Sequence, residues 1–123
     1  MINDIGQINL VVKDMQRATA FYRDTLGLQF LFAIPDGAFF QCGTLRLYLA
    51  LSRDPSTDYL PSILYFRVDD IKVAHAALVD KGVAFDQPPH VVASLPDHDL
   101  WLAFFRDSEG NIMALMCEVR GRN

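Results

Sequence analysis

The stretch Gln7-Ile8-Asn9-Leu10-Val11-Val12-Lys13-Asp14 returns in altered form as Ile63-Leu64-Tyr65-Phe66-Arg67-Val68-Asp69-Asp70. Each copy is an apolar, strand-like run that ends in an aspartate, so that Asp14 matches Asp70. Because a duplicated unit dictates an architecture, this repeat is the first guide to the fold. It predicts two copies of one module, each beginning with a β-strand.

A helical pattern follows each aspartate, with apolar residues three or four positions apart. Asp14 and Asp70 stand where the N-caps of these helices belong, because a carboxylate accepts hydrogen bonds from free backbone N–H groups. Each helix is expected to stop at a glycine, Gly27 in the first copy and Gly82 in the second. The recurrence of these signals in the same order supports the repeat.

The second half of the module also repeats, since Ala38-Phe39-Phe40 returns as Ala103-Phe104-Phe105. A hairpin is predicted after each of these strings, turning at residues 42–44 in the first copy and at residues 107–111 in the second. Each module therefore reads β, α, β, β, β.

The 123 residues fit one domain. We expect module one at residues 4–51, a linker rich in Ser, Asp, Pro and Thr at 52–61, and module two at 62–119. One helix for four strands covers only one face of a sheet. The predicted fold is therefore α+β, with two βαβββ modules that form a curved eight-stranded mixed sheet around a cleft, a frequent setting for small ligands.

Composition argues against several classes of partner. The formal net charge is −4 and the basic residues are dispersed, which disfavours nucleic acid. We see no apolar run of about 20 residues that could span a membrane and no export signal, so we expect a cytoplasmic protein. Cys42 and Cys117 fit no CxxC or zinc spacing. They are interpreted as structural thiols, with a reactive thiol as the alternative.

Two further stretches of sequence are informative together with the strand at residues 7–14. They are Phe21-Tyr22-Arg23-Asp24-Thr25-Leu26-Gly27-Leu28 and Phe105-Arg106-Asp107-Ser108-Glu109-Gly110-Asn111. With them the chain resembles the vicinal oxygen chelate superfamily, which contains glyoxalases, bleomycin-resistance proteins and extradiol dioxygenases. The resemblance covers nearly the whole chain, and it implies the fold more firmly than any activity. It also implies a homodimer, because members of this length commonly pair and each module leaves strand edges.

In metal-dependent members of this family, four side chains on four strands hold one divalent ion. Carried onto this sequence, the four positions fall on Gln7, Leu47, Ile63 and Ala114. This set offers one neutral oxygen and no carboxylate or imidazole, so it cannot compete with water for a transition metal. A slip of one position restores no His or Glu. We therefore expect no metal and no cofactor, with the four residues clustered on the concave sheet surface.

Alternation predicts the lining of the cleft, because side chains two apart on a strand share a face. The expected lining comprises Gln7, Asn9, Ile63, Tyr65 and Arg67, together with the hairpin residues Leu45, Leu47, Leu49, Ile112, Ala114 and Met116. Such a cleft is largely apolar. In it Arg67 is a candidate anchor for a carboxylate or another planar anion, or else a strand-end charge that reaches solvent.

Residues 88–99 form a connection that is longer than its counterpart in module one. Extra length in a repeat usually carries function, so we expect a flap over the cleft with His98 and Trp101 at or near its mouth. Taken residue by residue, the default interpretations are a solvated charged loop around His98 and core packing for Trp101, with contact at the cleft as the alternative for both. His75 is interpreted as a helix residue without function, and His90 begins the connection.

Three functions fit these observations. The leading hypothesis is a binding or resistance-type protein that holds a small, largely apolar molecule between its modules without metal. The second is a glyoxalase- or dioxygenase-type enzyme, in which Tyr65, His98 or a bound ion moves a proton at a carbon next to a carbonyl. The third is a scaffold domain whose cleft is filled by its own side chains, as Leu47 and Ile63 would permit.

Overall fold

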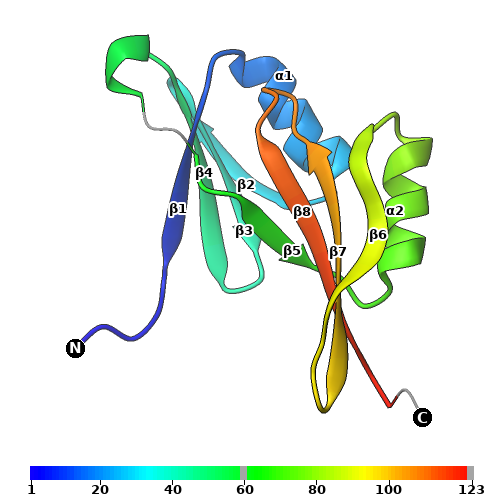
Figure 1. Ribbon diagram of the computed structural model, residues 1–123. Coiled ribbons are helices and arrows are strands. Elements are labelled where there is room, and N and C mark those ends of the chain that lie inside the picture. Colours follow the sequence, from blue (N-terminus) through cyan, green and yellow to red (C-terminus); the bar gives the residue numbers. More distant parts are fainter. Residues whose placement is uncertain (59–60, 122–123) are drawn as a thin grey trace. The chain divides into compact units, whose positions relative to one another are not determined.

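The computed structural model describes residues 1–58 and 61–121, and the chain divides into two compact units, Met1–Pro61 and Ser62–Asn123 (Figure 1). Unit 1 contains β1 (Gln7–Val12), α1 (Met15–Ala20), β2 (Gln29–Ile34), β3 (Gly37–Cys42) and β4 (Leu45–Leu51). Unit 2 contains β5 (Leu64–Arg67), α2 (Ile71–Asp80), β6 (Phe85–Ser94), β7 (His98–Arg106) and β8 (Ile112–Arg120). The α+β class and the two βαβββ modules are thus confirmed. Residues 59 and 60 of the expected linker lie outside the described part.

Both helices begin at the predicted aspartates. The Asp14 carboxylate accepts a hydrogen bond from the backbone N–H of Arg17 at 3.0 Å. Asp70 accepts from the backbone N–H groups of Lys72 and Val73 at 3.1 and 3.2 Å. Each cap therefore satisfies donors that the first helical turn leaves free.

Both helices end before the predicted glycines. A π-helical turn, Phe21–Thr25, prolongs α1. Gly27 has φ +75° and Gly82 has φ +90°, a backbone conformation that residues with a Cβ rarely adopt. No helix among the described residues has the length and apolar character needed to cross a membrane.

The two four-stranded sheets have the same topology. Their strand orders are β1-β4-β3-β2 and β5-β8-β7-β6, and in each sheet the first pair is parallel and the other pairs are antiparallel. Each unit packs its own helix on one face of its sheet. We call the opposite face the open face of that unit.

Large apolar side chains fill the space between each helix and its sheet. In unit 1 the ring of Tyr22 contacts that of Phe40 at 6.2 Å between centroids, and both side chains are fully buried. The core of unit 2 is built in the same way from Ile71, Leu78, Phe105, Met113 and Leu115. Burial of this kind is the main stabilising term of each unit.

The expectation that residues 88–99 form a long connection is wrong. These residues belong to β6 and β7, which pair up to Ser94 and Asp99, and only residues 95–97 lie between the strands. The backbone N–H of Leu95 closes the turn on the carbonyl of His98 at 2.8 Å. The register shifts between Gln87 and His90, so the two intervening prolines occupy an irregularity, where the lack of an N–H is tolerated.

Candidate functional site

The start of β1 carries polar side chains on the open face of unit 1. Gln7 pairs with Arg46 and Asn9 with Tyr48 in the parallel register with β4. Gln7 and Asn9 are exposed, whereas Leu10 and Val12, one step out of phase, are buried against the helix side. The predicted placement of Gln7 and Asn9 opposite the helix is confirmed.

The expected placement of Leu47 on the same face is wrong. Leu47 pairs with Ile8 on one side and Phe40 on the other, and it is 3% exposed in the core beneath α1. Leu45 and Leu49 share its face because they are two positions away. The open face of β4 belongs to Arg46 and Tyr48 instead.

The error comes from the two hairpin turns, which differ in length. In unit 1 residues 43–44 connect Cys42 to its partner Leu45, whereas in unit 2 residues 107–111 connect Arg106 to its partner Ile112. Counting the same distance from the turn glycine therefore reaches opposite faces in the two copies. Phe40 pairs with Leu47 and Phe105 with Met113, so the structural counterpart of Ala114 is Tyr48.

Three stacked rings cross the open face of unit 1. The ring centroids of Phe32 and Phe39 lie 4.6 Å apart with planes at 26°, and those of Phe39 and Tyr48 lie 4.5 Å apart with planes at 8°. We call Phe32, Phe39 and Tyr48 the aromatic stack. Sequence reasoning missed it, although the presence of aromatic residues on each of three consecutive predicted strands was a signal that could have found it.

The open face of unit 2 contains the second group of predicted site residues. Tyr65 pairs with Ala114 and Arg67 with Met116. Tyr65 is 49% exposed and lies edge-on to the ring of Phe104, with centroids 6.4 Å apart. Ile63 directly precedes β5 and is also exposed, whereas Ala114 is fully buried. The predicted sharing of one face by Tyr65, Arg67 and Ala114 is confirmed.

His98 lies at the first position of β7 within a network of charged groups. Its Nδ1 is 2.8 Å from a carboxylate oxygen of Asp97, and its Nε2 is 4.0 Å from Glu118. Arg120 donates to Asp97 at 2.7 Å and to Glu118 at 3.0 Å. These hydrogen bonds, first from Arg120 and then from His98, lower the pKa of Asp97 to about 2. His98 is thus held by carboxylates at the end of a hairpin rather than in a solvated loop.

Trp101 lies on the helix side of its sheet, so its expected place at the mouth of the cleft is wrong. It pairs with Cys117, whose thiol donates to the backbone carbonyl of Asp69, next to the start of α2, at 3.3 Å. The ammonium group of Lys72 on α2 lies 5.1 Å from the centre of the Trp101 ring. The default interpretation, packing on the core side, agrees with this placement against α2, where the side chain is partly buried.

The other two histidines make local contacts. The ring of His75, on α2, meets that of Phe85 edge-on with centroids 4.4 Å apart. His90 Nδ1 lies 2.7 Å from the carbonyl oxygen of Pro88. Both side chains are partly buried.

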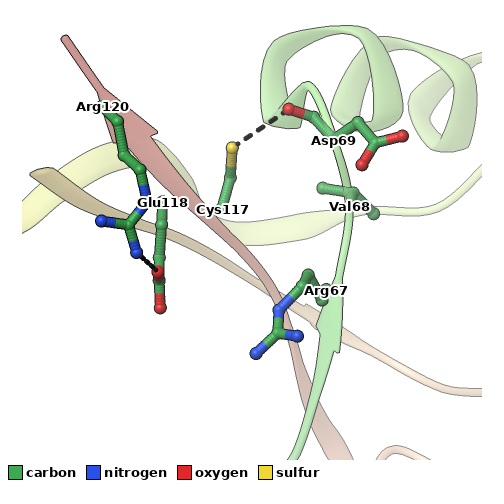
Figure 2. A pocket seen from close by; sticks show the side chains of 6 residues that line it. All are labelled: Arg67, Val68, Asp69, Cys117, Glu118 and Arg120. Atoms are coloured by element: carbon green, nitrogen blue, oxygen red, sulfur yellow. Dashed lines mark hydrogen bonds and ion pairs between the residues drawn. The ribbon is translucent and has the colours of Figure 1, made fainter. Parts of the chain in front are cut away.

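A pocket of about 320 Å³ opens within unit 2 (Figure 2). It lies where β5 leads into α2, beside the end of β8. Its lining residues are Arg67, Val68, Asp69, Cys117, Glu118 and Arg120. Arg67, singled out as a possible anion anchor, is therefore part of a pocket wall.

The positions that hold a divalent ion in metal-dependent relatives do not fit one here. With the corrected hairpin register they carry Gln7, Tyr48, Ile63 and Ala114. An amide, a phenol and two aliphatic side chains supply no carboxylate and no imidazole. Within residues 1–58 and 61–121, moreover, no three His, Cys, Asp or Glu side chains lie close enough together to form a metal site.

Comparisons with known proteins agree with this fold. The family model described as Glyoxalase/Bleomycin resistance protein/Dioxygenase superfamily matches residues 4–115. The chain is 28% identical to the uncharacterized protein YraH of Bacillus subtilis (strain 168), over 89% of this chain and 94% of that protein.

Solved structures with the same fold include a lactoylglutathione lyase from Agrobacterium tumefaciens, with 22% identity, a TM-score of 0.75 and 94% of each chain covered. TioX from Micromonospora sp. ML1 has 16% identity and a TM-score of 0.77, with 95% of this chain and 100% of that chain covered.

Proposed function

This chain belongs to the Glyoxalase/Bleomycin resistance protein/Dioxygenase superfamily, and we propose that it binds a small, largely apolar molecule without the help of a metal ion. The ligand would lie on the open faces of the two sheets, the faces that carry Gln7 and Asn9 in unit 1 and Tyr65 and Arg67 in unit 2. Its position between the two modules stays a prediction.

The aromatic stack is the observation that supports this proposal most directly. Its outermost residue, Phe32, lies on the edge strand β2 and is 46% exposed. A flat ligand ring can extend such a stack, because offset-stacked rings gain energy beyond the apolar area that they bury. The exposed Ile34, two residues further along β2, adds apolar surface.

Polar groups on the same faces would orient the ligand. Gln7 and Asn9 offer amide donors and acceptors beside the aromatic stack, while Tyr65 and Arg67 offer a phenol and a guanidinium in unit 2. The Arg67 guanidinium would donate two parallel hydrogen bonds to a carboxylate or another planar anion. His98 and the exposed Ile63 are further candidates for contact, whereas Ala114 is fully buried.

A scaffold with a self-filled face is less well supported. It relied on Leu47, which lies in the helix-side core, and on Ile63, which is 39% exposed. Phe32 and Tyr65 also keep close to half of their surfaces accessible. Apolar side chains left open in this way favour a partner molecule.

Anilinonaphthalene sulfonate (ANS), an aromatic anion that fluoresces in apolar surroundings, provides a direct test. We expect saturable binding with one molecule per chain, weakened by Phe32→Ala and Phe39→Ala because each shortens the aromatic stack. Val73→Ala is the control, since Val73 is 66% exposed on α2. Equal affinities in all three variants would contradict the proposal.

We further propose that the protein acts as a homodimer in the cytoplasm. Each sheet ends in edge strands that a second copy could extend. Cys42 and Cys117 are both free thiols, as expected in a reducing compartment, and burial raises the pKa of the Cys42 thiol. Sedimentation velocity tests the dimer, and a monomer at all protein concentrations would contradict it.

A further inference from the structure

The four strands of unit 1, all of which the structure describes, contain a single charged residue, Arg46. It lies on the open face of β4, where it pairs with Gln41 on one side and Gln7 on the other. Arg46 is exposed, and its side chain makes no hydrogen bond or ion pair with any part of the chain that the structure describes. The guanidinium is therefore available to a ligand, and these strands supply no carboxylate that would compete for it.

Arg46 adjoins one end of the aromatic stack. Tyr48 is two residues further along β4, so the two side chains leave the same face about 7 Å apart. Phe39 on β3 covers one face of the Tyr48 ring at 4.5 Å between centroids. The other face of that ring is turned away from β3, toward β1, where the partner of Tyr48 is the exposed Asn9. The stack ends there, because β1 contributes no aromatic residue.

Two other places are less suitable for an anionic ring. Phe32, at the opposite end of the stack, is on β2, which lies two strand spacings, about 10 Å, from the strand that carries Arg46. Arg67 in unit 2 shares its pocket with Glu118, whose carboxylate repels an anion over a short distance. The Tyr48 end is thus the place where a ring face and an uncompensated positive charge lie together.

We propose that the Tyr48 end of the aromatic stack binds aromatic carboxylates, with the ring stacked on Tyr48 opposite Phe39 and the carboxylate hydrogen-bonded to Arg46. A guanidinium suits this role because its planar fork matches the two carboxylate oxygens. The ring gains stacking energy beyond the apolar area that it buries. The inference rests on the proposed binding function and deepens it by naming a ligand class and its anchor.

Three probes separate the contributions of the ring and the charge. Cinnamate carries a flat ring and a carboxylate, cinnamamide lacks the charge, and cyclohexanepropionate lacks the aromatic ring. At neutral pH we expect cinnamate to shift the backbone amide resonances of residues 7–9 and 46–48 with a dissociation constant on the order of 1 mM. Each of the other probes should bind about five-fold more weakly, because either the ion pair or the stacking contact is lost.

Two variants assign each group of the ligand to its residue. Arg46→Gln should bind cinnamate and cinnamamide equally, because the carboxylate has lost its partner. Tyr48→Leu should bind cinnamate and cyclohexanepropionate equally, because the ring has lost the face on which it stacks. Arg17→Gln is the matched control and should keep the preferences of the parent protein, since it removes the same charge from an exposed residue of α1, on the other side of the sheet.

Several results would overturn the inference. One is the absence of shifts at residues 7–9 and 46–48 with cinnamate at about 10 mM. Another is equal binding of cinnamate and cinnamamide to the parent protein. A third is a preference for the carboxylate that persists in Arg46→Gln and is lost in Arg67→Gln, which would assign the anion to unit 2.

ANS keeps a failure of this inference distinct from a failure of the proposed function. If ANS and cinnamamide bind and Phe39→Ala weakens both, but cinnamate shows no advantage, the Arg46 anchor is rejected and the aromatic ligand is retained. If neither ANS nor any of the three probes binds, both proposals are rejected.

Discussion

The ring of Tyr48 lies nearly parallel to that of Phe39, with centroids 4.5 Å apart and planes inclined by 8°. The two residues are direct partners on β3 and β4. Tyr48 also occupies the position that is equivalent to Ala114 in the second repeat, where metal-dependent relatives carry a ligand. At this position the open face of unit 1 is therefore aromatic, which suits stacking rather than coordination.

Gly37 makes room for this arrangement. A Cβ at Gly37 would lie 2.8 Å from Cε1 of Tyr48 and 2.8 Å from Cγ1 of Ile34. We expect Gly37→Ala to lower the free energy of unfolding by about 1–3 kcal/mol, as overpacking does. Urea denaturation measures the loss, and Gly6→Ala is the control because a Cβ there meets nothing within 4 Å. Equal stability of the two variants would show that the side chains of Tyr48 and Ile34 move aside without loss of stability.

Leu47 should behave as a core residue. Leu47→Ala is expected to lower the free energy of unfolding by about 2–5 kcal/mol because it leaves a cavity beneath α1. Leu95→Ala, at a side chain that is 41% exposed, should cost less than about 1 kcal/mol. Chemical denaturation of both variants checks the difference. A small loss of stability in Leu47→Ala would indicate that Leu47 lies on the open face instead of in the core.

The hydrogen bonds that Asp97 accepts from Arg120 and His98 should make the stability of the protein depend on pH in the acid range. Its pKa falls from the ordinary value of 3.8 to about 2 in the folded chain, so the folded state binds protons less readily than the unfolded state does. The stabilisation is therefore fully present above the unfolded pKa and disappears as pH falls from 3.8 through about 2. Asp97→Asn should be less stable than the parent at neutral pH, with a gap that closes over this acid range.

Denaturation curves at several pH values measure that gap. Asp80→Asn, at an exposed carboxylate of α2, is the control and should show no comparable change. A gap between the parent and Asp97→Asn that stays constant down to about pH 2 would contradict the role of the network.

The fluorescence of Trp101 should be sensitive to its contact with α2. Because the Lys72 ammonium lies 5.1 Å from its ring centre, Lys72→Ala is expected to shift its emission to the red and to increase quenching by acrylamide. The lost cation–π contact should cost about 0.5–1 kcal/mol. Lys81→Ala serves as the control at the other end of the helix. Unchanged emission in Lys72→Ala would place the ring elsewhere.

The repeat made much of each module predictable from local signals. Asp14 and Asp70 cap the helices, and Gly27 and Gly82 follow their ends, because both effects depend on a few neighbouring backbone groups. The alternation in β1 likewise indicated that Gln7 faces away from the helix and Leu10 toward it. These features do not require knowledge of distant residues.

Strand pairing decided the remaining assignments. The face of Leu47 depends on the length of the turn before it, and a change of one residue moves every side chain of a strand to the other side. Residues 88–99 were interpreted as a connection because they are longer than their counterpart in module one, yet pairing between β6 and β7 holds most of them in the sheet. That pairing also turns Trp101 toward α2.

The sequence by itself determined the α+β class, the two βαβββ modules, the helix boundaries and the lack of His or Glu at the four family positions. Only the tertiary structure decided which rings form the aromatic stack and which residues line the pocket beside Arg67. Caps and alternation arise within a few residues of one segment. Stacks, pockets and ion pairs join residues far apart in the chain, so their partners follow from the register between strands.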